Sequence, residues 1–112
     1  MDDITDDGGL PHFVDRLNRF MAAYRWRDPI KLTFTGYDDH SLAARLTELG
    51  VPTSRSYVNQ IRSGTRRNPS ARLVLALSHA LHVLPEAWFD EAAAAAAVRT
   101  MDAATEALRQ DE

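Results

Sequence analysis

The chain has 112 residues, of which 45% are hydrophobic and 26% are charged, and its formal net charge at pH 7 is −3. This length suits one domain with a modest core, and the lack of cysteine excludes disulfides and thiolate zinc sites. The N-terminus has no apolar run of signal-peptide type, and the alanine-rich stretch 92–97 is too short to span a bilayer. We therefore expect a cytoplasmic protein that makes no use of a membrane.

Charge is distributed unevenly along the chain. Residues 1–48 carry nine acidic and six basic side chains, and residues 86–112 carry seven acidic and two basic ones. Residues 49–85 contain five arginines and no acid. An acid-free segment of this kind can present an anion-binding surface on an acidic protein, although such a gap also arises by chance.

The N-terminal part of the chain predicts a tail followed by a helix. Residues 1–9 are acidic and end in two glycines, so we expect a disordered tail. The first helix is predicted to begin near Pro11 and to end before Pro29. Its apolar residues recur at helical spacing and predict a buried stripe of Phe13, Leu17, Phe20, Met21 and Tyr24.

Segment 26–40 is predicted to be an ordered loop. The alternation in "IKLTF" permits a short strand, but no partner strand is evident, so we expect no strand. Asp38 and Asp39 lie just before the next helix, where negative charge is favoured. The side chains expected to hold the loop are Trp26, Ile30 and Phe34.

Two helices joined by a short turn are predicted next. The first extends from an N-cap at Ser41 to Leu49, and Gly50 ends it. Thr53 or Ser54 then caps a helix over residues 54–63, and Gly64 ends that helix.

The remaining sequence predicts three further helical pieces. Ser70 caps a helix with an apolar stripe, and residues 85–89 form one short turn in which Trp88 and Phe89 seal the core. A final alanine-rich helix over residues 90–109 is a candidate for dimerisation. Its predicted contact seam follows a 4-3-4-3 spacing and comprises Ala94, Val98, Met101, Thr105 and Leu108.

These elements predict an all-α protein with five to six helices. We expect the acidic tail at 1–9, a helical domain at 10–89 and the C-terminal helix at 90–112.

The helix 54–63 has the chemistry of a DNA-reading helix. Its apolar residues lie on one side, and polar side chains that donate and accept hydrogen bonds lie on the other. The major groove of B-DNA admits one α-helix, and arginine, glutamine and serine can bond to base edges there. Arg55 and Ser56 lie in its first turn and Gln60 one turn later, while the arginines of loop 65–69 are placed to bind phosphate.

The chain resembles the Cro/repressor-type (Xre) helix-turn-helix family, most clearly in residues 42–89. The resemblance depends on "SRSYVNQIRSG", "RRNPS" and "LHVLPEAWF" in combination, and it extends over about residues 11–90. Within the family the chain is most similar to nucleoid-associated regulators of the EspR type, whose first helix reads much like "FVDRLNRF". The turn 50–54 is longer than in the shortest repressors, and the C-terminal segment is short, so the mode of dimerisation does not carry over.

The resemblance implies a compact helix-turn-helix bundle that binds double-stranded DNA as a transcriptional regulator or nucleoid-associated protein. We expect no cofactor, and we expect a homodimer because a single small module makes too few contacts for tight, specific binding. The resemblance implies base contacts from Arg55, Ser56 and Gln60. It implies backbone or flanking contacts from Ser41, Ser54, Tyr57, Asn59, Arg62, Thr65, Arg66, Arg67 and Asn68.

Other functions have less support in the sequence. His79 and His82 are spaced i, i+3 on a helix, but no carboxylate or cysteine of that helix completes a metal site, so we expect none. No phosphate-cradling glycine loop or nucleophile motif indicates an enzyme. The serious alternative is a non-catalytic protein-interaction module, an antitoxin or an adaptor, on the same fold.

Overall fold

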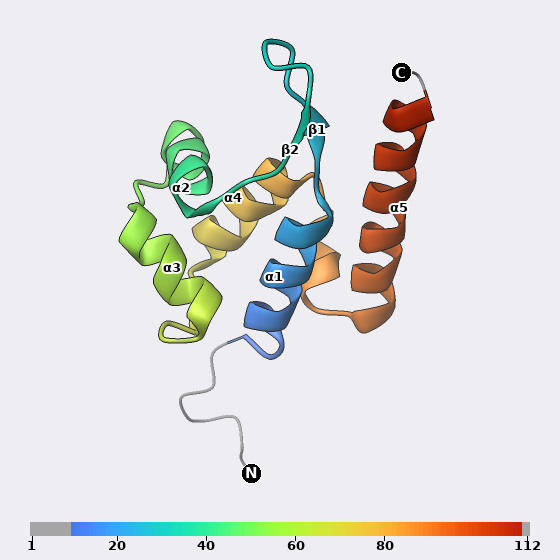
Figure 1. The fold of residues 1–112 in the computed structure, drawn as a ribbon. Coiled ribbons are helices and arrows are strands. Elements are labelled where there is room, and N and C mark those ends of the chain that lie inside the picture. Colours follow the sequence, from blue (N-terminus) through green and yellow to red (C-terminus); the bar gives the residue numbers. More distant parts are fainter. Residues whose placement is uncertain (1–9, 111–112) are drawn as a thin grey trace.

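The computed structural model describes residues 10–110, and this part of the chain is mostly helical (Figure 1). The predicted tail 1–9 and the last two residues lie outside the described residues. The mainly helical prediction is confirmed, whereas the prediction that there are no strands is wrong. The elements are α1 (Phe13–Ala23), β1 (Trp26–Arg27), β2 (Phe34–Thr35), α2 (Asp39–Glu48), α3 (Arg55–Ser63), α4 (Ala71–Leu81), the 3-10 helix η1 (Pro85–Trp88) and α5 (Glu91–Gln110).

Strands β1 and β2 form a small antiparallel hairpin. Trp26 pairs with Thr35 and Arg27 pairs with Phe34. The hairpin turn places Ile30 at its tip, where the side chain is 89% exposed, so the prediction that Ile30 holds this segment is wrong. The sequence did not predict β1, the partner of β2, because β1 is only two residues long and follows closely after the first helix.

Helix α1 ends earlier than predicted. The backbone becomes extended at Tyr24, and the helix gives way to β1 well before Pro29. The Arg25 guanidinium donates hydrogen bonds to the carbonyl oxygens of Met21 and Tyr24, at 3.0 and 2.8 Å. These bonds occupy acceptors that the end of the helix leaves unpaired.

The core is built around Trp88. Its indole ring contacts Phe13 and Phe20 of α1, with ring centroids 5.5 and 5.0 Å apart. Its ring nitrogen donates a 2.8 Å hydrogen bond to the buried hydroxyl of Ser78 on α4. Trp88 thus seals the core as predicted, but Phe89 is 64% exposed, because one short turn of helix can bury only one side.

Helix α5 packs on its own domain, alongside α1 and η1 (Figure 1). Ala94 and Met101 are buried in this packing, and the Arg109 guanidinium lies 5.6 Å from the ring centre of Phe34. The predicted dimer seam therefore faces the interior of the same chain at Ala94 and Met101, and its other members, Val98, Thr105 and Leu108, are half-buried.

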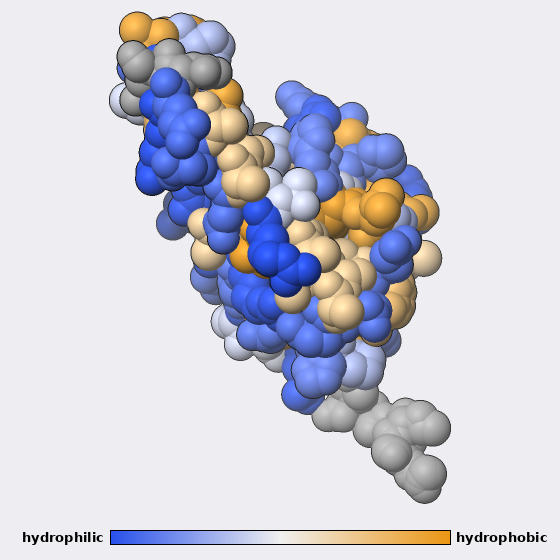
Figure 2. Space-filling view, turned by 90° about the vertical axis from the view of Figure 1, so that its right-hand side faces the viewer, coloured by the Kyte–Doolittle hydropathy of each residue, from blue (hydrophilic) through white to orange (hydrophobic). Residues whose placement is uncertain are grey.

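Figure 2 views the molecule from the side of α5. Weakly hydrophobic residues follow the helix between strongly hydrophilic ones and continue onto the body of the domain. Within residues 10–110, no helix has both the length and the apolar character needed to cross a membrane.

Candidate nucleic-acid interface

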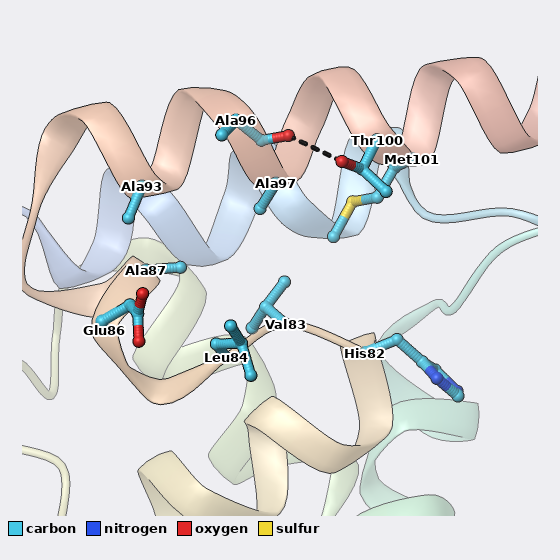
Figure 3. A pocket seen from close by; sticks show the side chains of 10 residues that line it. All are labelled: His82, Val83, Leu84, Glu86, Ala87, Ala93, Ala96, Ala97, Thr100 and Met101. Carbon is cyan, nitrogen blue, oxygen red and sulfur yellow. Dashed lines mark hydrogen bonds between the residues drawn. The ribbon is translucent and has the colours of Figure 1, made fainter.

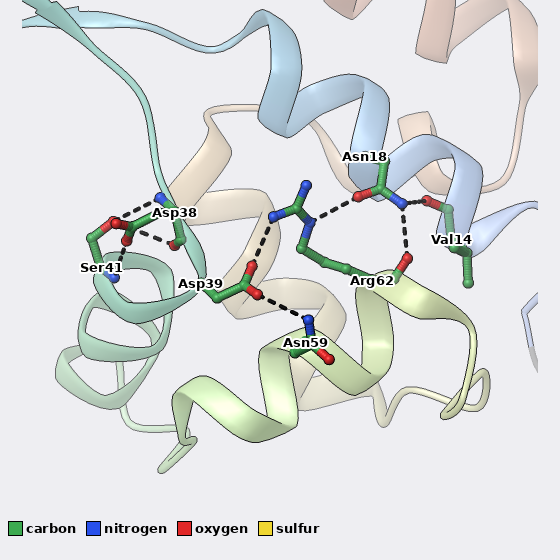
Figure 4. Close-up of polar contacts among 7 residues, drawn as sticks. All are labelled: Val14, Asn18, Asp38, Asp39, Ser41, Asn59 and Arg62. Carbon is green, nitrogen blue, oxygen red and sulfur yellow. Dashed lines mark hydrogen bonds and ion pairs between the residues drawn. The ribbon is translucent and has the colours of Figure 1, made fainter.

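Helix α2 begins three residues earlier than predicted, because Asp38 rather than Ser41 is its N-cap. The Asp38 carboxylate accepts a 2.7 Å hydrogen bond from the Ser41 backbone N–H, and the Ser41 hydroxyl accepts a 3.0 Å bond from the Asp38 N–H (Figure 4). Asp38 is favoured as the N-cap because its carboxylate accepts the bond from the Ser41 N–H and also places negative charge at the positive end of the helix.

This cap also bears on the phosphate contact expected at Ser41. The amide and hydroxyl of Ser41 are both engaged with Asp38. The Ser41 backbone N–H and then its hydroxyl hold the pKa of the Asp38 carboxyl below its usual range, so this group is ionised near neutral pH. Its negative charge repels phosphate, and the geometry gives the contact at Ser41 no support.

The turn between α2 and α3 is held by backbone and side-chain bonds. Gly50 has a φ of 96°, in the left-handed region that favours glycine, and the Val51 N–H bonds back to the carbonyl of Leu46 at 3.0 Å. The Ser54 hydroxyl accepts a 3.1 Å hydrogen bond from the Tyr57 N–H, so Ser54, one of the two predicted candidates, is the N-cap. The start of α3 is thereby fixed relative to α2.

Helix α3 divides into an anchored face and an outward face. Val58 and Ile61 are fully buried in the core, whereas Arg55 and Ser56 at the start of the helix are exposed. Neither outward side chain has a hydrogen bond or ion pair within the described residues. Arg55 and Ser56 are therefore free to bind a ligand.

A polar network fixes the other end of α3 (Figure 4). Arg62 donates hydrogen bonds to the Asn18 side-chain oxygen at 2.8 Å and to the Asp39 carboxylate at 2.7 Å. The Asn18 amide nitrogen donates to the backbone carbonyls of Val14 and Arg62, both at 3.0 Å. The Asn59 amide donates to the second Asp39 oxygen at 3.3 Å. The network ties α3 to both α1 and α2.

The network changes the roles expected for two residues. Arg62 and Asn59 were expected to flank a DNA contact, but both side chains already bind Asp39. Arg62 also neutralises the one carboxylate that approaches α3 in this network. Sequence reasoning missed Asn18 and Asp39, since a pairing between residues so far apart leaves no local pattern.

Loop 65–69 begins with a second group of contacts to α3. Arg66 donates to Gln60 twice, from its backbone N–H to the Gln60 carbonyl at 3.1 Å and from Nε to the side-chain Oε1 at 2.6 Å. The Arg66 guanidinium also lies 5.5 Å from the ring centre of the half-buried Tyr57. The hydroxyls of Thr65 and Ser63 are 3.1 Å apart and share a hydrogen bond.

The rest of the loop is exposed at Arg67 and Asn68. The Arg67 carbonyl accepts a 3.1 Å hydrogen bond from the Leu10 N–H, which connects this loop to the segment before α1. The structure thus places the predicted base readers on α3 and the predicted phosphate binders directly after it.

A concave site lies between α5 and the segment that follows α4 (Figure 3). This groove of about 310 Å³ is lined mainly by alanine and aliphatic side chains. Its two titratable side chains, His82 and Glu86, lie at opposite ends of it (Figure 3). His82 stacks on Tyr24, with ring centroids 5.3 Å apart, and residues 10–110 contain no group of three side chains able to hold a metal. The groove offers no catalytic constellation.

Comparison with models of protein families finds no match for this chain, and comparison with curated proteins finds no relative. The case for a function therefore depends on the chemistry of the α3 surface.

Proposed function

We propose that this protein binds double-stranded DNA, with α3 in the major groove and loop 65–69 on the phosphates. It would act without enzymatic activity, as a transcriptional regulator or a nucleoid-associated protein on the Cro/repressor-type helix-turn-helix plan. The observation that carries the proposal is the division of α3 described above. A rigidly held helix presents Arg55 and Ser56 to solvent with no partner inside the described chain.

Electrostatics support this assignment. Arg62 offsets Asp39, so the exposed arginines 55, 66 and 67 leave α3 and its loop positive on a chain whose net charge is −3. Positive charge beside a protruding helix attracts the phosphate backbone whatever the sequence, and contacts to base edges then add specificity.

A homodimer belongs to the proposal, because a single small module makes too few contacts for tight, specific binding. The two copies of α3 would lie about 34–36 Å apart, one turn of DNA. Ala94 and Met101 of the predicted α5 seam are buried inside the chain, so these two side chains are not available to an interface in this arrangement. Sedimentation equilibrium with and without DNA would measure the oligomeric state.

The alternative is a protein-interaction module, and one observation favours it. Leu84 and Phe89 are 67% and 64% exposed, and with Leu75 they form an apolar surface beside Pro85. Exposed apolar surfaces of this kind often bind other proteins.

Selection from a pool of random duplexes, followed by a salt titration, tests the proposal. The wild-type protein should enrich a motif, and Arg55→Ala should lose about 1–3 kcal/mol on that motif but little on random duplex. Arg99→Ala removes an exposed arginine from α5, on the far side of the molecule from α3 (Figure 1), and serves as the matched control.

The possible results separate the candidate functions. Binding without enrichment but with a steep salt dependence would indicate nucleoid coating rather than sequence reading. Equal losses for Arg55→Ala on all sequences would assign Arg55 to phosphate. No binding at low salt would refute the DNA proposal and leave the protein-interaction module.

A further inference from the structure

The side chains of Gln60 and Arg66 form a coupled pair on the outward side of α3. Arg66 Nε donates a short, 2.6 Å hydrogen bond to Gln60 Oε1. The Arg66 backbone N–H also bonds to the Gln60 carbonyl, and the Tyr57 ring supports the guanidinium from 5.5 Å. Three contacts thus hold Arg66 against α3 instead of leaving it extended into solvent.

The pairing changes what Gln60 can offer to a base. A free glutamine binds adenine with both ends of its amide, since the oxygen accepts from the base N6 amino group and the nitrogen donates to N7. Here the amide oxygen already accepts from a cation, and the guanidinium beside it repels the positively polarised hydrogens of an adenine amino group. The groups that remain are mainly donors, namely the Gln60 amide nitrogen and the two terminal nitrogens of Arg66, against one remaining lone pair on the Gln60 oxygen beside the guanidinium.

We propose that the Gln60–Arg66 pair reads guanine, and that Arg66 is a specificity-determining residue rather than only a phosphate contact. Guanine is the base that presents two acceptors, N7 and O6, and no donor in the major groove. The inference depends on the proposed DNA-binding function and names the base that this part of α3 recognises. It also revises the sequence-based assignment of Arg66 to the DNA backbone.

The test compares Arg66→Lys with Arg67→Lys. Both changes keep the positive charge. Lysine, however, lacks the planar guanidinium whose Nε–H donates to the Gln60 oxygen. Each variant, the wild type and Gln60→Ala are selected on random duplexes, and the position that Gln60→Ala relaxes is identified. Affinities are then measured for the wild-type motif with guanine or adenine at that position, and for random duplex.

Wild type should prefer guanine at that position, and Arg66→Lys should shift the preference toward adenine by roughly tenfold. Binding to random duplex should change less than about twofold, because the charge is retained. Arg67→Lys should leave the base preference unchanged. A thermal melt checks that Arg66→Lys is folded, and Gln60→Ala still reports the base preference if it is not.

Three results would overturn the inference, and they can be told apart. A wild-type motif with adenine at the Gln60 position, or identical base preferences for Arg66→Lys and Arg67→Lys, refutes the guanine-reading pair alone. Selection of no motif by the wild type refutes sequence reading and the pair together.

Discussion

Replacing Asn18 with alanine should destabilise the protein and loosen α3, although Asn18 lies outside the α2–α3 unit. Its side chain makes three hydrogen bonds: it donates to the carbonyls of Val14 and Arg62 and accepts from the Arg62 guanidinium. Asn18→Ala removes all three, and it leaves Arg62 with only Asp39 as a side-chain partner.

The magnitude follows from these contacts. A net hydrogen bond contributes about 1 kcal/mol, and a bond to a charged group contributes about 1.5–3 kcal/mol. Asn18 and Arg62 are half-buried, so water replaces part of what is lost. We therefore expect a loss of about 2 kcal/mol, which corresponds to a fall in Tm of roughly 8–16 °C for a domain of this size.

Urea and thermal unfolding followed by circular dichroism would measure the effect. Asn68→Ala is the control, because Asn68 is exposed and has no side-chain hydrogen bond within residues 10–110. The control should change the free energy of unfolding by less than about 0.5 kcal/mol. The reasoning is wrong if Asn18→Ala and Asn68→Ala unfold at the same urea concentration.

Three further changes test other parts of the fold. Ser78→Ala leaves the buried Trp88 ring N–H without an acceptor, so the free energy of unfolding in urea should fall by about 1–3 kcal/mol. Ser78→Thr keeps the hydroxyl and should lose less. Gly64→Ala should cost about 1 kcal/mol in the same assay, because the φ of 88° that ends α3 strains any residue with a Cβ; no loss would mean that the turn can relax. The pKa of Asp38 is lower in the folded than in the unfolded protein, so its contribution is complete above about pH 5 and is lost as the pH falls below about 4. Asp38→Asn should therefore flatten the loss of stability between about pH 5 and pH 3 in urea titrations, and an unchanged acid profile would contradict the capping role.

Local signals in the sequence were sufficient to place α3 and its surroundings. Ser70 caps its helix as predicted, Ser54 is one of the two predicted caps of α3, and Gly64 ends α3 in the left-handed conformation. The helical spacing of Val58 and Ile61 among polar residues identified which face of α3 is buried. These features depend on neighbours within a few residues, so the sequence reveals them directly.

Competition between nearby candidates was harder to predict. Asp38 and Ser41 are both good caps, and the helix begins at the one that also brings negative charge to its N-terminus.

The β1–β2 hairpin was missed because two-residue strands carry no periodic pattern, and because its stability comes from packing of Trp26 against Tyr24 and Tyr37.

The sequence by itself determined the mainly helical architecture, most helix ends and the outward position of Arg55 and Ser56 on α3. Only the tertiary structure decided that Ala94 and Met101 of α5 are buried against their own domain. It also decided that Arg62 binds Asn18 and Asp39 and that Arg66 binds Gln60. The physical reason is one of range. Capping and periodicity act within one or two turns of a helix, whereas the partner of a polar side chain depends on which elements meet in space.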